Sequence, residues 1–239
     1  DTVDVDITFM AYGMTDEQAI ANCESLDASF MPDENDRLVI ESIKPVGISN
    51  ASIAYKLRVP ENCSMRIETS NGTVRVADIS APVDVKTSNG RIEIKNIAAD
   101  AKAVTSNGRV ELANVAGKVY VATSNGSVKY RGFLSPDEHI AKTSNGRISF
   151  TIPSEQRVLV NARTSNGSIR CKMPKQLIIN EGKRSLEAIV GDGDPEGAMP
   201  TISLKTSNGS IHVEPGMLED LLPAQPVTPE ISSEEIIAL

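Results

Sequence analysis

The chain has 239 residues, a net charge of −8 at pH 7 and no tryptophan, and only 3% of its residues are aromatic. Its apolar residues are mainly Val, Ile and Ala, which predicts a thin core of small, branched side chains rather than a large globular centre. No run of about 18 apolar residues is present, so we expect no segment of this chain to span a membrane as a helix.

The charge is unevenly distributed along the chain. Residues 1–60 carry a net charge of −7, residues 61–213 carry +5, and residues 214–239 carry −6. The chain begins at Asp1 without an initiator Met, a basic segment or an apolar segment. We therefore expect that a targeting segment has been removed or that this is a cut chain.

Residues 1–62 do not repeat and are predicted to form a small α+β cap. Alternating apolar residues predict a strand over 3–9, and two further strands are predicted over 38–43 and 52–59. Residues 15–18 have the spacing of a capping box and should begin a helix that is broken by residues 31–36. Such a cap would cover the open end of a stacked sheet, where unpaired backbone groups invite aggregation.

Seven copies of the tetrapeptide Thr-Ser-Asn-Gly follow. The first four copies are 18 residues apart, and the later intervals are 20, 21 and 42 residues. A fixed period near 20 residues is the signature of a stacked architecture. Apolar and polar residues alternate on both sides of each copy, which indicates strands with one buried face. The Thr of each copy is in phase with that face, and its Ser points outward.

We therefore predict an all-β fold, in which residues 63–213 form a single-stranded, right-handed parallel β-helix-like solenoid with coils of 18–21 residues. Stacked coils lie about 4.8 Å apart, so identical Asn side chains can form a hydrogen-bond ladder. We expect Asn and Gly to supply the left-handed backbone of a sharp corner. The predicted ladder consists of Asn71, Asn89, Asn107, Asn125, Asn145, Asn166 and Asn208.

An antiparallel β-meander is the alternative, because Asn-Gly between alternating strands is a strong hairpin signal. One repeat is expected to be degenerate, since Ala188–Gly193 occupies the place of a missing copy in the 42-residue interval. Residues 214–239 form an acidic tail with few structural cues, which we expect to be flexible or to dock as a peptide. A related hypothesis is that this tail folds back onto basic residues of the repeats.

Basic residues flank many of the repeated tetrapeptides and are the candidate binding residues. In a solenoid they would line up along one edge and form a cationic stripe that suits an anionic polymer. Aromatic residues do not interleave these charges, so nucleic acid is not an expected ligand. The predicted stripe consists of Lys86, Lys142, Arg163 and Lys205 before the tetrapeptide and of Arg91, Arg109 and Arg147 after it.

No catalytic or cofactor site is predicted. His139 and His212 are far apart in the repeats, without acidic or Cys neighbours at metal-ligand spacing. The three cysteines form no CxxC pair and do not identify a compartment. The acidic cluster of Asp192, Asp194 and Glu196 could hold Ca²⁺, but it lacks the remaining ligands of an EF-hand, and a solvated loop is the preferred interpretation.

The repeated pattern Thr-Ser-Asn-Gly, x, Ile/Val, x, Ile/Val behind a non-repeating N-terminal section resembles the bacterial putative-adhesin domain family of unknown function, over about Met65–Val213. The resemblance implies a β-helix-like fold, an envelope or surface location, and no established catalytic activity. We therefore expect a non-catalytic surface protein, monomeric or weakly self-associating, that binds an anionic glycan, an envelope component or another protein. The alternatives are a self-associating scaffold and, less favoured, a carbohydrate-active enzyme.

Overall fold

The structure is a computed structural model that describes residues 2–34, 37–48, 50–194 and 196–217. The chain divides into two compact units, Asp1–Pro60 and Glu61–Leu239. The acidic tail that we predicted over 214–239 lies mostly outside the described residues. Its first three residues belong to the last strand, which ends at Gly216.

The first unit contains one helix and two separate antiparallel strand pairs. The helix α1 spans Asp16–Glu24. The pairs are β1 (Asp4–Ala11) with β4 (Ala51–Arg58), and β2 (Asp27–Pro32) with β3 (Leu38–Ile43). The predicted helix and the three predicted strands are therefore present, whereas β2 was not predicted. Its Pro32 stands at the strand's last position, where a missing N–H interrupts no ladder.

The capping box predicted at the start of α1 has a modified form. Thr15 Oγ1 accepts a hydrogen bond from the backbone N–H of Gln18 at 3.2 Å, as expected of an N-cap. The Gln18 side chain reaches back to the N–H of Met14, at 3.0 Å, rather than to that of Thr15. The two bonds fix the point at which the chain enters the helix.

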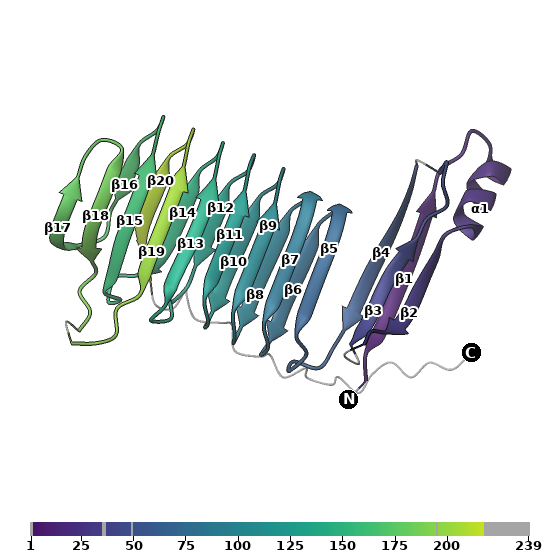
Figure 1. Cartoon of the computed structure of the whole chain (residues 1–239), viewed down its shortest axis with the longest axis horizontal. Coiled ribbons are helices and arrows are strands. Elements are labelled where there is room, and N and C mark those ends of the chain that lie inside the picture. Colours follow the sequence, from purple (N-terminus) through teal and green to yellow (C-terminus); the bar gives the residue numbers. More distant parts are fainter. Residues whose placement is uncertain (1, 35–36, 49, 195, 218–239) are drawn as a thin grey trace, which may run out of the picture. The chain divides into compact units, whose positions relative to one another are not determined.

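The second unit consists of two facing sheets that run along the solenoid (Figure 1). The nine-stranded sheet contains, in spatial order, β17 (Lys175–Glu181), β18 (Ser185–Val190), β15 (Val158–Thr164), β19 (Thr201–Thr206), β13 (Glu138–Thr143), β11 (Val119–Thr123), β9 (Ala101–Thr105), β7 (Val83–Asn89) and β5 (Met65–Asn71). The seven-stranded sheet contains β16 (Ile169–Cys171), β20 (Ile211–Gly216), β14 (Ile148–Pro153), β12 (Val128–Arg131), β10 (Val110–Val115), β8 (Ile92–Ile97) and β6 (Val74–Ile79).

Each coil contributes one strand to each sheet, and the Thr-Ser-Asn-Gly corner joins the two. Neighbouring coils pair in parallel and in register, so that Val83, Ala101 and Val119 face one another across β7, β9 and β11. The parallel β-solenoid is thereby confirmed, and the meander alternative is wrong, because the strands on either side of a corner lie in different sheets. The interior is thin, as the composition predicted; its bulkiest contact is the stacked pair Tyr130 and Phe150, with ring centroids 5.1 Å apart.

The Asn and Thr side chains of the repeated tetrapeptide hold successive coils together. The seven asparagines form one continuous ladder, in which each Nδ2 donates to the Oδ1 of the adjacent Asn at 2.7–3.1 Å. Five of the Thr hydroxyls donate to the Gly carbonyl of the adjacent coil at 3.0–3.4 Å. These hydroxyls are buried, so the carbonyl satisfies a group that would otherwise destabilise the fold.

The corner glycines are required for a different reason from the one we predicted. The expectation of left-handed backbone is wrong: of the seven corner glycines, only Gly72 has a positive φ, and none of the corner asparagines does. In the other six, a Cβ would lie 1.8–1.9 Å from the carbonyl oxygen of the adjacent corner glycine. Glycine is needed because two backbones lie in contact there.

A second, shorter ladder was not predicted. Asn96 Nδ2 donates to Asp78 Oδ1 at 2.8 Å, and Asn114 Nδ2 donates to Asn96 Oδ1 at 3.1 Å. These three residues are the non-glycine positions with positive φ among the described residues, at 54–59°. Gly132, at 137°, continues their 18-residue spacing. The left-handed backbone therefore occurs at this corner, where Asn and Asp tolerate it.

The last coil in the sequence is not the last coil in space. The coil of β19 and β20 lies between the coil of β13 and β14 and the coil of β15 and β16, with parallel pairing on both sides (Figure 1). The prediction of a degenerate repeat at Ala188–Gly193 is wrong. Residues 175–190 instead form the antiparallel hairpin of β17 and β18, which pairs with β15.

Substitution of one corner glycine should destabilise the solenoid sharply. In Gly126→Ala, the new Cβ would lie 1.8 Å from the Gly108 carbonyl oxygen, and neither backbone can move without breaking the register. We expect a loss of about 1–3 kcal/mol in the free energy of unfolding, measured by chemical denaturation. The matched control is Gly182→Ala, whose Cβ would meet a side chain, Ser185 Oγ, at 3.2 Å. Equal losses for the two variants would contradict the backbone-contact explanation.

The coil of β19 and β20 is inserted between two coils that precede it in the sequence. Its disruption should therefore also destabilise the coil of β15 and β16. Leu204 in β19 is 1% exposed, and Leu204→Asp places an unpaired charge in the core. Because each coil is stabilised by its neighbours, we expect β15 and β16 to lose hydrogen-exchange protection together with β19 and β20, while β5–β10 keep theirs. The control Val85→Asp, in β7, should reverse this pattern. Retained protection of β15 and β16 in Leu204→Asp would refute the inserted order.

Candidate functional site

The basic residues that precede the corners lie in one row on the outer face of the nine-stranded sheet. The strand register gives the order of this row as Glu68, Lys86, Val104, Ala122, Lys142, Lys205, Arg163 and Ser185. The row is therefore not a continuous stripe. Lys86 is separated from the others by Val104 and Ala122, whereas Lys142, Lys205 and Arg163 are direct neighbours on β13, β19 and β15.

The arginines that follow the corners lie at the start of the seven-stranded sheet, and each contacts a nearby polar or acidic side chain. Arg91 forms ion pairs with Glu93 at 2.8 Å and with Glu111 at 2.7 Å, and Arg109 contacts Glu111 at 3.4 Å. Burial disfavours the Glu111 carboxylate, but the hydrogen bond from Arg91 and the attraction of Arg91, Arg109 and Lys129 together outweigh burial and lower the pKa of Glu111. Arg147 donates to Ser210 Oγ at 3.3 Å. The structure thus divides the predicted stripe into paired and unpaired cations.

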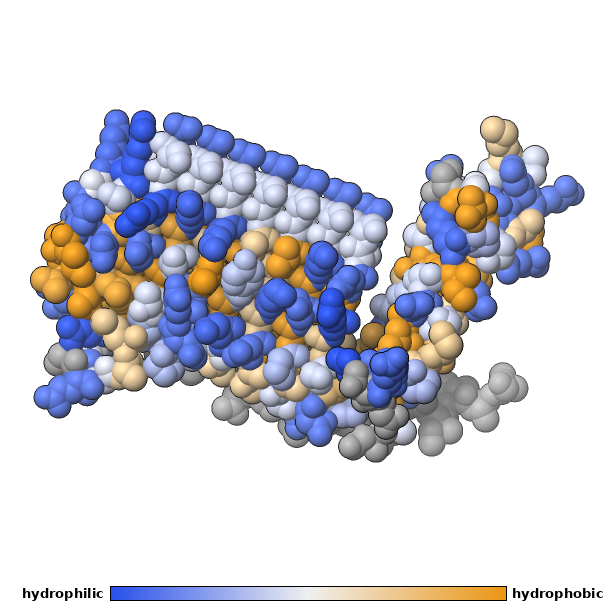
Figure 2. Space-filling view, in the orientation of Figure 1, coloured by the Kyte–Doolittle hydropathy of each residue, from blue (hydrophilic) through white to orange (hydrophobic). Residues whose placement is uncertain are grey.

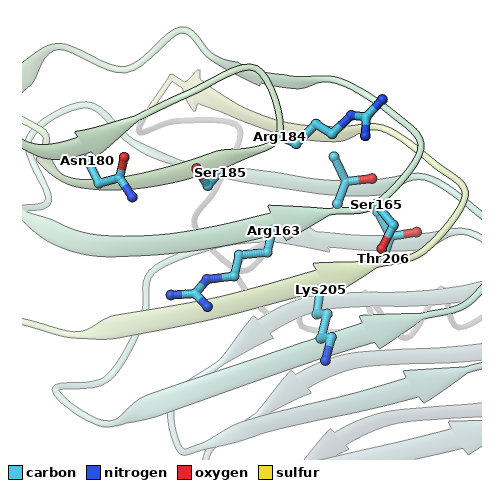
Figure 3. A pocket seen from close by; sticks show the side chains of 8 residues that line it. Arg163, Ser165, Asn180, Arg184, Ser185, Lys205 and Thr206 are labelled. Carbon is cyan, nitrogen blue, oxygen red and sulfur yellow. The ribbon is translucent and has the colours of Figure 1, made fainter.

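At the end of the sheet formed by β13, β19 and β15, several unpaired cations lie next to one another, whereas Lys86 is isolated on β7. We call Lys142, Lys205, Arg163 and Arg184 the basic cluster. All four are exposed, and no Asp or Glu of the described residues forms an ion pair with any of them. Three of them border an open depression of about 470 Å³ whose lining contains no carboxylate (Figure 3).

Arg184 reaches this cluster through the hairpin that sequence reasoning missed. The turn between β17 and β18 is closed by a hydrogen bond from the Gly182 N–H to the Ser185 carbonyl at 2.8 Å. The Arg184 carbonyl accepts from the Thr164 N–H at 3.0 Å, which places the turn beside the corner at the end of β15. No repeat pattern pointed to Arg184, because it lies in the 42-residue interval and only the inserted topology brings it here.

Polar groups and a half-buried apolar area surround the cluster. On the corner side, Ser144, Ser207 and Ser165 follow the three strands, and the corner residues form a polar strip along one edge of the solenoid (Figure 2). Toward the middle of the sheet, Tyr120 and Ile140 are half-buried on the outer face, and Lys142 Nζ lies 6.0 Å from the centroid of the Tyr120 ring. The outer face thus changes from mixed charges, through this area, to cations.

The residues considered for catalysis or metal binding have structural partners. His139 is fully buried; its Nδ1 accepts from the Val119 N–H at 3.2 Å, and its Nε2 lies 2.8 Å from the Ser135 carbonyl oxygen. Asp192 accepts from Gln176 at 2.7 Å, and Asp194 accepts from the Glu196 N–H at 2.9 Å. Within the described ranges, no three His, Cys, Asp or Glu side chains are grouped as metal ligands would be.

The three cysteines are separate thiols, and none is placed as a nucleophile. Cys23, Cys63 and Cys171 are free and partly buried. Burial raises the pKa of the Cys171 thiol, which disfavours the reactive thiolate. The single helix among the described residues is too short to cross a membrane.

Comparisons with known proteins bear on the family of the chain. The profile of the Toastrack DUF4097 family matches residues 50–214, which confirms the resemblance drawn from the repeats. A similar solved structure is that of a putative cell adhesion protein from Clostridium sporogenes, with 12% sequence identity and a TM-score of 0.37, covering 80% of this chain and 76% of that one. No curated protein sequence gives a significant match.

The buried His139 should make the stability of the solenoid depend on pH. Burial lowers the pKa of His139, although the nearby Asp137 and Asp100 carboxylates oppose the shift. Below the ordinary His pKa of 6.5, the unfolded chain therefore binds a proton that the folded chain resists, and stability falls as the pH falls. We expect a slope of up to about 1.4 kcal/mol per pH unit in urea unfolding between about pH 7 and pH 5.

His139→Asn should remove most of this slope, because its Oδ1 can still accept from the Val119 N–H but does not titrate in this range. The control is His212→Asn, since that ring lies on the outer face of β20. The pKa of His212 is also lowered, by partial burial and then by Arg147. His212→Asn should therefore remove a small part of the slope and keep most of it. An unchanged slope in His139→Asn would contradict the assignment.

Proposed function

The chain belongs to the Toastrack DUF4097 family, and we propose that it is a non-catalytic, adhesin-like protein of the cell envelope or cell surface. In this proposal the solenoid is a rigid support that presents a binding face to a polymer or to a protein partner. The surface location rests on the resemblance of the repeat region to bacterial adhesin-like domains.

The observation that carries the proposal is the contrast between the corners and the outer face. At the corners, the same four residues recur and are hydrogen-bonded from coil to coil. On the outer face, the residues at equivalent positions vary in charge and polarity along the row, from Glu68 at one end, through Val104 and Ala122, to Arg163 at the other. A constant frame with a variable exposed face is the arrangement expected of repeat proteins that bind through an extended surface.

A binding role is preferred to catalysis because the candidate catalytic groups serve the fold. His139 uses both ring nitrogens in contacts with the backbone, and the carboxylates of Asp192 and Asp194 accept local hydrogen bonds. A polysaccharide hydrolase would need two carboxylates facing each other across a cleft. The open depression beside the basic cluster is lined by cations, hydroxyls and an amide instead.

Self-association is a second candidate, favoured by the terminal strand β17. Its Leu177, Ile178 and Ile179 are 50–54% exposed, and Figure 2 shows apolar surface at this end of the solenoid. Against it, β17 has two irregularities in its register and an ion pair between Lys175 and Glu181. Bulges and charges are the features by which natural edge strands avoid pairing with other chains.

Co-sedimentation with purified bacterial envelopes tests the proposal. We expect the full chain to bind saturably and to be displaced by unlabelled chain, and we expect it to release no reducing sugar ends from the envelopes. The control is Leu204→Asp. This substitution disrupts the coils that carry the basic cluster, so the variant should no longer bind the envelopes. Absent or non-saturable binding would refute the adhesin-like role, and newly formed reducing ends would favour an enzyme. An apparent molecular mass that increases with protein concentration in light scattering would favour the self-associating scaffold.

A further inference from the structure

Building on the proposed function, we infer that the basic cluster is a binding site for an acidic polysaccharide, which lies along the solenoid axis and crosses β13, β19 and β15. Its carboxylate or sulfate groups are bound by Lys142, Lys205 and Arg163, with Arg184 at the far end. The chemical class follows from the charge, the spacing and the polar surroundings of these four residues.

The cluster brings adjacent cations without an internal counter-charge together on neighbouring strands, whereas several other cations of the solenoid are ion-paired. Lys102 pairs with Asp84 at 2.8 Å, Arg66 pairs with Glu68 at 2.6 Å, and Arg75 pairs with Glu93 at 3.3 Å. The cluster has no such acidic partner among the described residues. Like charges on adjacent strands destabilise a sheet, so their retention on three neighbouring strands indicates a role for an external anion.

The spacing of the cluster suits a linear polymer. Lys142 is opposite Lys205, and Lys205 is opposite Arg163, in the parallel register of β13, β19 and β15. Neighbouring strands are about 4.8 Å apart, which is comparable to the length of one sugar residue. A chain that runs along the solenoid axis therefore meets one cation per strand. Arg163 can also bind a carboxylate or sulfate through two parallel N–H groups.

The groups beside this line of cations match the hydroxyls of sugars. On the corner side are the hydroxyls of Ser144, Ser207 and Ser165, and on the other side are Ser203 and Asn161, which occupy the outward positions two residues before Lys205 and Arg163. Hydroxyls and amides both donate and accept hydrogen bonds. A polymer in this position would have its charges over the cations and its hydroxyls over these side chains.

The surface fits other anionic macromolecules less well. Single-stranded nucleic acid binds to aromatic side chains on which its bases stack. Tyr120 is the aromatic residue on the outer face of the described nine-stranded sheet, and the Lys142 ammonium lies 6.0 Å from its ring centroid. An anionic membrane surface favours apolar residues that insert between the lipids. Ile140 and Ala122, which lie beside Lys142 on the outer face, are half-buried, and the exposed Leu177, Ile178 and Ile179 lie on β17, two strands beyond β15.

Fluorescence anisotropy with labelled polysaccharides tests the site in the full chain. The probes are polygalacturonate as a carboxylated polymer, heparin as a sulfated polymer and dextran as a neutral one. The test variant combines Lys142→Gln, Lys205→Gln and Arg163→Gln. The matched control combines Lys95→Gln, Lys129→Gln and Arg170→Gln, which removes the same charge from exposed residues of the seven-stranded sheet. Thermal unfolding should be similar for both variants, because all six side chains are exposed.

We expect the unchanged chain to bind an acidic polysaccharide in a salt-sensitive manner and to ignore dextran. The test variant should bind at least about tenfold more weakly, whereas the control should change by less than about threefold. Equal losses in the two variants, or equal binding of dextran, would overturn the site. Tighter binding of a single-stranded oligonucleotide or of phosphatidylglycerol vesicles would overturn the ligand class, as would no binding of either acidic polymer.

Envelope co-sedimentation separates this inference from the proposed function. If the test variant still sediments with envelopes as the unchanged chain does, the polysaccharide site is wrong and the adhesin-like role stands. If polygalacturonate binds through the cluster but envelopes do not bind, the site stands and the envelope role is wrong.

Discussion

The coils of this solenoid stack in register because each corner glycine lies directly against the backbone of the glycine in the adjacent coil. A side chain at that point would overlap a carbonyl oxygen, so the contact holds only between glycines. The contact brings the Asn side chains within hydrogen-bond distance and the Thr hydroxyls within reach of the glycine carbonyls. One backbone contact thus sets the positions of two side-chain types in the tetrapeptide, Asn and Thr, while the Ser hydroxyl remains available to solvent.

The same contact permits the inserted order of the coils. Any coil that ends in Thr-Ser-Asn-Gly presents the same surface above and below, so the corner does not distinguish which coil follows in the sequence. Asn208 is therefore accommodated between Asn145 and Asn166 with the same ladder geometry as the others. The spatial order must be specified elsewhere. The hairpin of β17 and β18 contributes to this, since it pairs with the free side of β15 and leaves the other side to β19.

Features with a local cause could be predicted from the sequence, and features that depend on coil order could not. The parallel solenoid, the buried Thr and the Asn ladder follow from the period and the phase of one tetrapeptide. The role of the glycines was misjudged, because Asn-Gly commonly indicates left-handed backbone, and that backbone occurs instead at Asp78, Asn96 and Asn114. The inserted coil and Arg184 could not be found from spacing, since an interval of twice 21 residues equally describes a missing repeat.

The insertion sets the order of the cations in the basic cluster and gives Arg184 its place beside them. Were the coils stacked in sequence order, Lys142 would be adjacent to Arg163, and Lys205 would lie beyond it, where the hairpin now pairs with β15. The inserted coil instead places Lys205 between them and leaves the edge of β15 to the turn that carries Arg184. Because these side chains point outward, substitutions among them do not touch the glycine contact or the ladder. The frame can therefore stay constant while the charge on its outer face is adjusted to a ligand.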